Sequence, residues 1–189
     1  MTKPSDSGPL AGLRVLDLTR LLPGPVCTLY LADLGADVIK IEDTGAGDYA
    51  RSLGNRPGTV SAFFRAVNRN KRSAALNLKD PRGREAFLAL AKGADAIVES
   101  FRPGVVASLA VGYGAIAAIN PRVVYASISG YGQTGPRAMA AGSARPMAAP
   151  RGRRPAEKGA RLLPRKAGSD NHQVPVQAAR RGVHVSSRA

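Results

Sequence analysis

The sequence predicts a doubly wound α/β domain on a parallel sheet, followed by a disordered basic C-terminal tail. Short apolar segments alternate with helical segments between residues 13 and 128, and glycine or proline marks the boundaries between them. A strand, a helix and a second strand follow one another within residues 13–42. This spacing is typical of a βαβ unit, in which the two strands must pair in parallel.

The first three elements carry this prediction. Apolar and polar residues alternate over Leu13–Leu18, which indicates a strand. The residues Pro23–Pro25 then break the chain and open an apolar helix over about 26–34, and Gly35 is expected as its C-terminal cap. The segment Asp37–Glu42 is predicted as the second strand.

The same pattern repeats further along the chain. A short strand is expected at Ser73–Leu78, after a long irregular segment over 44–70 that contains one or two helical turns. Asp80 and Pro81 supply an N-cap and a first-turn proline for a helix over 82–92. The remaining expected elements are strands at 94–99 and 121–128 and short helices at 104–110 and 112–119. Together they describe a partial Rossmann-like sheet, in which ligands bind at the carboxyl ends of the strands.

The composition divides the chain into residues 1–142 and 143–189. Residues 1–136 hold 16 Lys/Arg and 11 Asp/Glu, whereas residues 137–189 hold 12 and 2 and few large apolar side chains. Such a tail cannot offset a chain entropy of roughly 1–2 kcal/mol per residue, so we expect disorder. An Arg/Ala/Pro/Gly mixture is what a GC-rich gene encodes when read out of frame. The alternative is a basic arm for nucleic acid or acidic lipid.

Charge and hydropathy exclude several classes of protein for residues 1–136, which we call the body of the chain. Most of the net charge of +15 lies in the tail, and a mildly basic body fits an anionic small-molecule ligand rather than nucleic acid. No apolar run reaches eighteen residues and no signal-peptide pattern is present, so we expect a cytoplasmic protein without membrane partners. The one cysteine, Cys27, is expected to be a buried apolar residue rather than a nucleophile.

A series of motifs then occurs in a fixed order. They are Pro9–Thr19, Pro23–Pro25, Leu31–Glu42, Gly47–Arg51, Asn70–Ser73, Leu76–Lys79, Glu99–Val105, Asn120–Arg122 and Ser129–Pro136. Together they closely resemble the opening of family III CoA-transferases, which include formyl-CoA transferase, carnitine CoA-transferase and alpha-methylacyl-CoA racemase. The resemblance covers about residues 9–142, a third of a usual member. It implies transfer of CoA between carboxylic acids, or a racemase-type isomerisation, with acyl-CoA as substrate and no permanently bound cofactor.

The resemblance also implies where CoA binds. CoA carries a 3′-phosphate and a pyrophosphate, so its site needs basic groups and backbone donors at strand ends. The implied contacts are Lys71, Arg72, Leu76, Asn77, Leu78, Lys79, Ser100, Phe101, Arg102, Gly130 and Gly132. Glycines in the last loop admit a close backbone approach to the acyl-thioester. Relatives commonly have basic residues where this chain has Asp43 and Ser108, which predicts weakened CoA affinity.

The resemblance assigns no catalytic residue to this chain. Racemase-type members continue with a His-Asp pair where this sequence has Ser143 and Ala144, and transferases use a later Asp as the nucleophile. His172 and His184 lie in the tail, where the expected disorder would leave them without fixed partners. Three aspartates of the body are read as caps or surface charges: Asp17, Asp33 and Asp95. We therefore expect an inactive chain that lacks the interlocked homodimer of full-length relatives.

Two other functions remain open on the residues themselves, and a third is disfavoured. The chain could bind CoA without catalysis, or it could bind nucleic acid through its tail. A nicotinamide-dependent dehydrogenase is disfavoured, because the turn at 19–25 lacks the Gly-x-Gly-x-x-Gly fingerprint. The CoA-binding hypothesis makes a geometric prediction: Lys79 and Arg102 should converge on one rim of a parallel sheet.

Overall fold

The computed structural model describes residues 8–54, 60–140 and 176–179, the last four as backbone. These residues form one sheet with the strand order β3-β2-β1-β4-β5-β6. The strands are β1 Arg14–Leu18, β2 Asp37–Glu42, β3 Arg72–Ala75, β4 Ala96–Glu99, β5 Val124–Ile128 and β6 Val176–Ala179. Strands β1 to β5 pair in parallel and β6 pairs antiparallel with β5, so the predicted parallel α/β sheet is confirmed.

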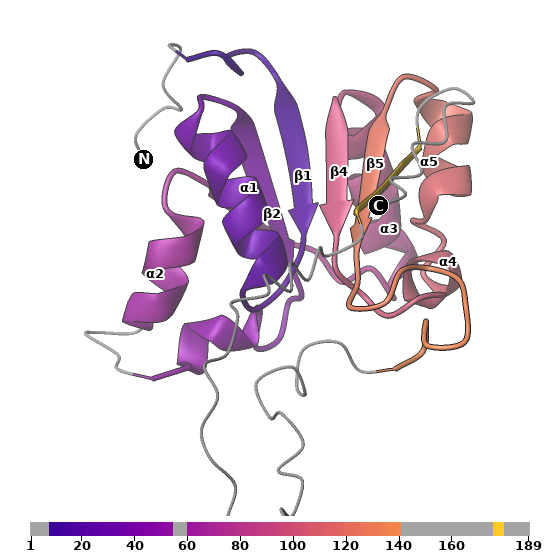
Figure 1. Ribbon diagram of the computed structural model, residues 1–189. Helices are drawn as coiled ribbons and strands as arrows, with labels where there is room; N and C mark the ends of the chain where they lie inside the picture. The colour runs from indigo at the N-terminus through magenta and orange to yellow at the C-terminus, as the bar shows by residue number, and fades with distance from the viewer. Residues whose placement is uncertain (1–7, 55–59, 141–175, 180–189) are drawn as a thin grey trace, which may run out of the picture.

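Helices cover both faces of the sheet (Figure 1). They are α1 Pro23–Asp33, the 3-10 helix η1 Tyr49–Ser52, α2 Ala62–Asn68, α3 Pro81–Lys92, α4 Val105–Ser108 and α5 Tyr113–Ile119. Figure 1 shows α1 and α2 on one side of the sheet and α3 to α5 on the other. This two-sided cover is the doubly wound arrangement that the alternating sequence pattern predicts.

Buried side chains pack on both faces of the sheet. The cluster under α1 contains Val15, Ala32, Ala36, Val38, Val98 and Ile128. The larger cluster under α3 and α5 contains Leu16, Leu18, Ile39, Ile41, Phe87, Ile97, Ile116 and Tyr125, among others. Helices on both faces leave β1 buried at every position after Arg14, as is typical of a central strand in a parallel sheet.

The observed bounds of the helices and strands differ from the predicted ones where local hydrogen bonding determines where an element begins or ends. Helix α1 begins at Pro23, since a proline costs nothing in the first turn, where its missing N–H would lack a partner. Strand β3 ends at Ala75 instead of Leu78. There the amide of Asp80 donates to the Asn77 carbonyl at 3.0 Å and closes a turn. Residues predicted to extend the strand therefore form a loop at its carboxyl end.

Two further expectations need correction. Cys27 is exposed on the outer side of α1, because the adjacent Thr28 is the residue that faces the sheet. At Val176–Ala179 the structure has a strand where disorder was expected. The rest of the predicted disordered tail, including His172 and His184, lies outside the described residues. Within the described ranges, no helix combines the length and the apolar character that crossing a bilayer requires.

Candidate functional site

A cavity of about 560 Å³ opens at the carboxyl-terminal edge of the sheet. It lies where the strand order reverses between β1 and β4, the position at which open α/β sheets bind ligands. Its lining residues are Leu18, Arg20, Ile41, Glu42, Asp43, Thr44, Leu76, Asn77, Leu78, Lys79, Phe101, Val105, Ser108 and Leu109. We refer to this cavity as the edge pocket. Its volume is in the range of small-molecule sites.

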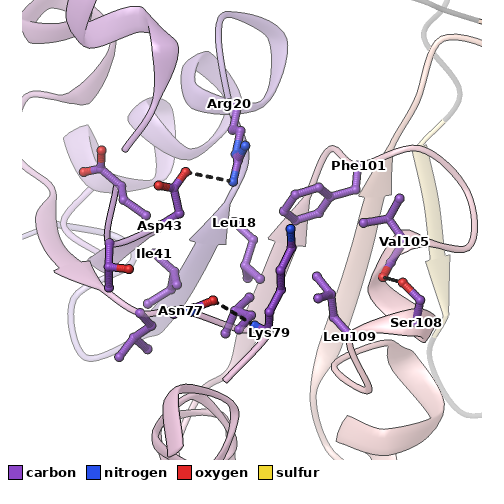
Figure 2. A pocket seen from close by; sticks show the side chains of 14 residues that line it. Leu18, Arg20, Ile41, Asp43, Asn77, Lys79, Phe101, Val105, Ser108 and Leu109 are labelled. Atoms are coloured by element: carbon purple, nitrogen blue, oxygen red, sulfur yellow. Dashed lines mark hydrogen bonds and ion pairs between the residues drawn. The ribbon is translucent and has the colours of Figure 1, made fainter. Parts of the chain in front are cut away.

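Apolar side chains form the inner walls of the edge pocket. Leu18 is the last residue of β1, Ile41 is the last but one of β2, and Phe101 follows β4 (Figure 2). Val105 and Leu109 face them from α4 and its C-terminal cap. A site with apolar walls and a few polar groups suits a ligand that combines an apolar ring with a charged part.

Lys79 is the cation of the pocket without a counter-ion. It is exposed, and in the part of the chain that the structure describes no carboxylate pairs with its ammonium. Its side chain points into the pocket from the loop after β3 (Figure 2). The Lys79 amide donates to Asn77 Oδ1 at 3.1 Å, so the backbone of the loop is fixed while the ammonium stays available. A free ammonium beside apolar walls favours an anionic ligand.

Helix α3 holds this loop in place through a glycine. A Cβ at Gly83 would lie 2.2 Å from the Asn77 carbonyl oxygen, so only glycine lets the helix approach so closely. The Asp80 side chain accepts from the Arg82 amide at 2.8 Å and caps the same helix. The loop that carries Lys79 is therefore packed against the first turn of α3.

Arg20 follows β1 and forms the opposite rim of the pocket. Its guanidinium carbon lies 5.4 Å from the ring centroids of both Tyr49 and Phe101. Its Nη1 donates to Tyr49 Oη at 3.0 Å, and its Nη2 lies 3.4 Å from Asp43 Oδ2 (Figure 2). Its backbone amide donates to Ser100 Oγ at 3.1 Å. Arg20 is not among the site residues predicted from the sequence, although its place two residues after a strand end was the available signal.

The carboxylate of Glu42 is already neutralised by its neighbours. Arg51 donates two hydrogen bonds to it at 2.7 Å, and Ser73 Oγ and the Asp48 amide donate at 2.7 and 3.1 Å. Burial alone would raise the pKa of Glu42, but these hydrogen bonds lower it to about 2. Glu42 is therefore ionised at neutral pH and has a strong internal partner.

A second buried carboxylate supports Phe101. Glu99 ends β4 and is 1% exposed, and its Oε2 accepts from the Phe101 amide at 2.7 Å. Burial raises the pKa of Glu99. The hydrogen bond fixes the backbone at the strand end, and with it the start of the side chain that forms the pocket wall.

Lys71 is not part of the pocket, contrary to the sequence-based expectation. Its ammonium donates to Asp17 Oδ2 at 3.0 Å, Asn68 Oδ1 at 3.0 Å, Thr28 Oγ1 at 2.8 Å and the Pro25 carbonyl at 2.8 Å. Burial lowers the pKa of Lys71. Asp17 is correspondingly a buried counter-ion and not the cap or surface charge that its sequence position suggested.

Arg72 also lies elsewhere. It is the first residue of β3, and its guanidinium pairs with Asp37 at 2.6 Å near the amino end of β2. In a parallel sheet the amino ends of the strands lie on the edge opposite the carboxyl ends, where ligands bind. Its position is therefore wrong for a contact in the edge pocket.

The other predicted residues divide into lining and flanking groups. The lining group, which the structure brings together at one rim, is Leu76, Asn77, Leu78, Lys79 and Phe101. Ser100 lies behind the lining and holds the backbone of Arg20. Arg102, Gly130 and Gly132 follow β4 and β5 but do not line the edge pocket, so their contacts with a ligand stay predictions.

The fold and the pocket define an α/β domain with an apolar pocket and, among the described residues, an unpaired ammonium, that of Lys79, at the carboxyl edge of its sheet. Comparison with known families identifies the domain more closely. The model of CoA-transferase family III matches residues 10–152, past the boundary at 142 that the composition suggested. The chain belongs to this family, as its sequence motifs indicate.

Individual relatives agree with this assignment. Succinyl-CoA:glutarate CoA-transferase of Mus musculus is 51% identical over 135 residues, 71% of this chain and 31% of the relative. Acetyl-CoA:oxalate CoA-transferase of Acetobacter aceti is 50% identical over 137 residues, 72% of this chain and 35% of the relative. The chain thus spans about a third of the length of these relatives.

Solved structures show the same fold. A CAIB/BAIF family protein from Brucella suis superposes with a TM-score of 0.68 and 41% identity, covering 71% of this chain and 37% of that protein. A hypothetical protein from Mycobacterium tuberculosis gives a TM-score of 0.67 and 38% identity, over 72% of this chain and 38% of that protein.

Proposed function

We propose that this chain is the CoA-binding part of a CoA-transferase that moves CoA between carboxylic acids. The observation that carries the proposal is the free ammonium of Lys79 at the rim of an apolar pocket at the sheet's switch point. The named relatives transfer CoA between succinate and glutarate or between acetate and oxalate, which supports acyl-CoA as the substrate. That both are transferases favours transfer over racemisation.

Different residues of the pocket would contact different parts of CoA. Lys79 would act as a point charge on a phosphate group. Leu18, Ile41 and Leu109 would exclude water from the adenine, which carries most of the apolar surface of the nucleotide. The chain would bind CoA as a substrate and not as a resident cofactor.

We also propose that this chain alone does not transfer CoA. Transfer through an acyl-enzyme needs a carboxylate that is free to attack the thioester. The two carboxylates that line the edge pocket are Glu42 and Asp43, and they face Arg51 and Arg20. Neither is placed as an unpaired nucleophile. Incubation of the purified chain with succinyl-CoA and glutarate should give no glutaryl-CoA by mass spectrometry, and measurable product would overturn this part.

Calorimetric titration with CoA tests the binding proposal. We expect saturable binding by the wild-type chain and a loss of about tenfold in affinity in Lys79→Gln, because a charge-assisted contact to phosphate is removed. Lys92→Gln is the matched control, since Lys92 is exposed at the far end of α3. A flat trace with the wild-type chain, or equal affinities for CoA and adenosine, would contradict the proposal. A cytoplasmic location and the loss of the homodimer stay predictions.

A further inference from the structure

The second cation of the edge pocket, Arg20, is preorganised for binding but is not free. Its guanidinium lies between the rings of Tyr49 and Phe101, at 5.4 Å from each centroid, and donates to Tyr49 Oη. A guanidinium held by two aromatic rings loses little conformational entropy when it takes a further ligand. One donor, Nη2, instead faces the carboxylate of Asp43.

The pairing between Arg20 and Asp43 is weak by comparison with others in the same chain. Nη2 lies 3.4 Å from Asp43 Oδ2, whereas the Arg51–Glu42 and Arg72–Asp37 pairs measure 2.7 and 2.6 Å. The two side chains are 31% and 41% exposed, so water screens their attraction. An oxyanion with two charges could therefore take the Nη2 donor at small cost.

The backbone of the following loop holds Asp43 where it is. Its Oδ1 accepts from the amides of Gly45 and Gly47 at 2.9 and 3.3 Å, which leaves Oδ2 directed at the guanidinium. The carboxylate lines the same pocket as Lys79, so its charge would repel an incoming anion. Asp43 thus opposes anion binding in two ways, by pairing with Arg20 and by its own negative charge.

We propose that Arg20 is a second anion-binding residue of the edge pocket and that Asp43 is its built-in competitor, so that a diphosphate must take over the Arg20 donor from Asp43. The planar guanidinium suits a phosphate oxyanion because it can donate two parallel hydrogen bonds. The inference rests on the proposed function and adds to it the group that contacts the diphosphate and the residue that limits its affinity.

A double-mutant cycle tests this inference with inorganic pyrophosphate and CoA as calorimetric probes. Asp43→Asn keeps the Oδ1 acceptor for the two glycine amides and removes only the charge. We expect affinity for both probes to rise roughly fivefold in Asp43→Asn and to fall about tenfold in Arg20→Gln. The matched controls are Asp37→Asn and Arg14→Gln, which change the same charges in the Arg14–Asp37 pair at 3.0 Å, outside the edge pocket.

The double variant Arg20→Gln with Asp43→Asn gives the decisive result. If Asp43 competes for Arg20, its substitution should gain little once Arg20 is gone. A full fivefold gain in the Arg20→Gln background would overturn the inference and reduce Asp43 to a bulk repulsive charge. Unchanged affinity in Asp43→Asn would overturn the inference as well. In that case the proposed function would still stand, provided that the wild-type chain binds CoA. The opposite pattern, in which Asp43→Asn strengthens pyrophosphate binding through Arg20 but CoA does not bind, removes the proposed function alone.

Discussion

The ammonium of Lys71 lies 3.0 Å from Asp17 Oδ2, and the two side chains are 1% and 0% exposed. Both groups are charged and shielded from water, and Asp17 also accepts from Thr28 Oγ1 at 2.6 Å and Thr19 Oγ1. A buried pair that is fully hydrogen-bonded stabilises its surroundings only while both partners remain. The pair joins β1, α1 and the residue before β3, and so holds the strands that form one side of the edge pocket.

Removal of one partner should therefore destabilise the fold rather than weaken ligand binding alone. We expect Lys71→Met to lower the free energy of unfolding by about 3–5 kcal/mol, because it leaves the Asp17 carboxylate buried without a counter-ion. Urea denaturation followed by circular dichroism measures the loss. The double variant with Asp17→Asn should recover much of it, and Arg72→Gln, which breaks an exposed pair, should cost under ~1 kcal/mol. Normal stability in Lys71→Met with lost CoA affinity would contradict this and return Lys71 to the ligand site.

The acid sensitivity of the fold should depend on Glu42. Its pKa of about 2 in the folded chain lies below the ordinary 4.5, so it stabilises the fold fully above pH 4.5. This stabilisation is lost as the pH falls from 4.5 to 2, because the unfolded chain then takes up the proton more readily. Allowing for the exposure of Arg51, we expect on the order of 2 kcal/mol.

Urea titrations of wild type and Glu42→Gln at several pH values separate this contribution from that of other carboxylates. The difference between the two proteins should be constant at neutral pH and shrink between pH 4.5 and 2. A difference that does not change over this range would show that Glu42 is not held ionised by Arg51 and Ser73.

The layers of the fold could be predicted from the sequence, because the hydrophobic pattern and the glycine and proline residues between elements agree along most of residues 13–128. Strand β2 has the predicted bounds, Asp37–Glu42, since an apolar run lies between a glycine turn and a polar loop. The predicted bounds were wrong where a side chain or backbone group closes a local turn, as Asn77 does after β3. Such turns depend on single hydrogen bonds that periodicity does not record.

The site was predictable only in part, for a related reason. Lys79 and Phe101 lie in the loops that follow β3 and β4, so the parallel topology brings them to the same edge of the sheet. Lys71 is also a lysine next to β3, since it directly precedes the strand. Its side chain nevertheless faces inward, because Asp17 and Thr28 offer it buried acceptors. Whether a lysine points to solvent or to a buried carboxylate depends on partners distant in sequence, here 54 residues away.

The close packing of α3 against the Lys79 loop should make Gly83 essential. A Cβ at this position would meet the Asn77 carbonyl at 2.2 Å, and neither backbone can yield without moving the loop. We expect Gly83→Ala to lower stability by about 1–3 kcal/mol and to weaken CoA binding. Gly114→Ala is the matched control, since Gly114 is also helical but has open space around it, and it should be neutral or stabilising by about 0.5–1 kcal/mol. Thermal melts and CoA titrations of both variants check the pair, and equal behaviour would show that the loop tolerates the methyl group.

The rim of the edge pocket beside α4 offers a site at which affinity should be gained. Ser108 lines the pocket, but its Oγ donates to the Val105 carbonyl at 2.8 Å and so serves its own helix. An arginine there would add a cation across the pocket from Asp43 (Figure 2), and among the described lining residues it would join Lys79 as a cation without a counter-ion. We expect Ser108→Arg to tighten CoA binding about tenfold, as a new charge-assisted hydrogen bond to phosphate would.

Salt dependence separates that contact from a general increase in positive charge. The gain in Ser108→Arg should persist in part at 0.5 M salt if the guanidinium touches phosphate, and should vanish if it acts only at a distance. Ser108→Ala is expected to bind CoA as the wild type does, because the native hydroxyl is directed at Val105 and not at the ligand. If Ser108→Arg leaves the affinity unchanged at low salt while Lys79→Gln reduces it, the phosphates lie on the Lys79 side of the pocket, beyond reach of α4.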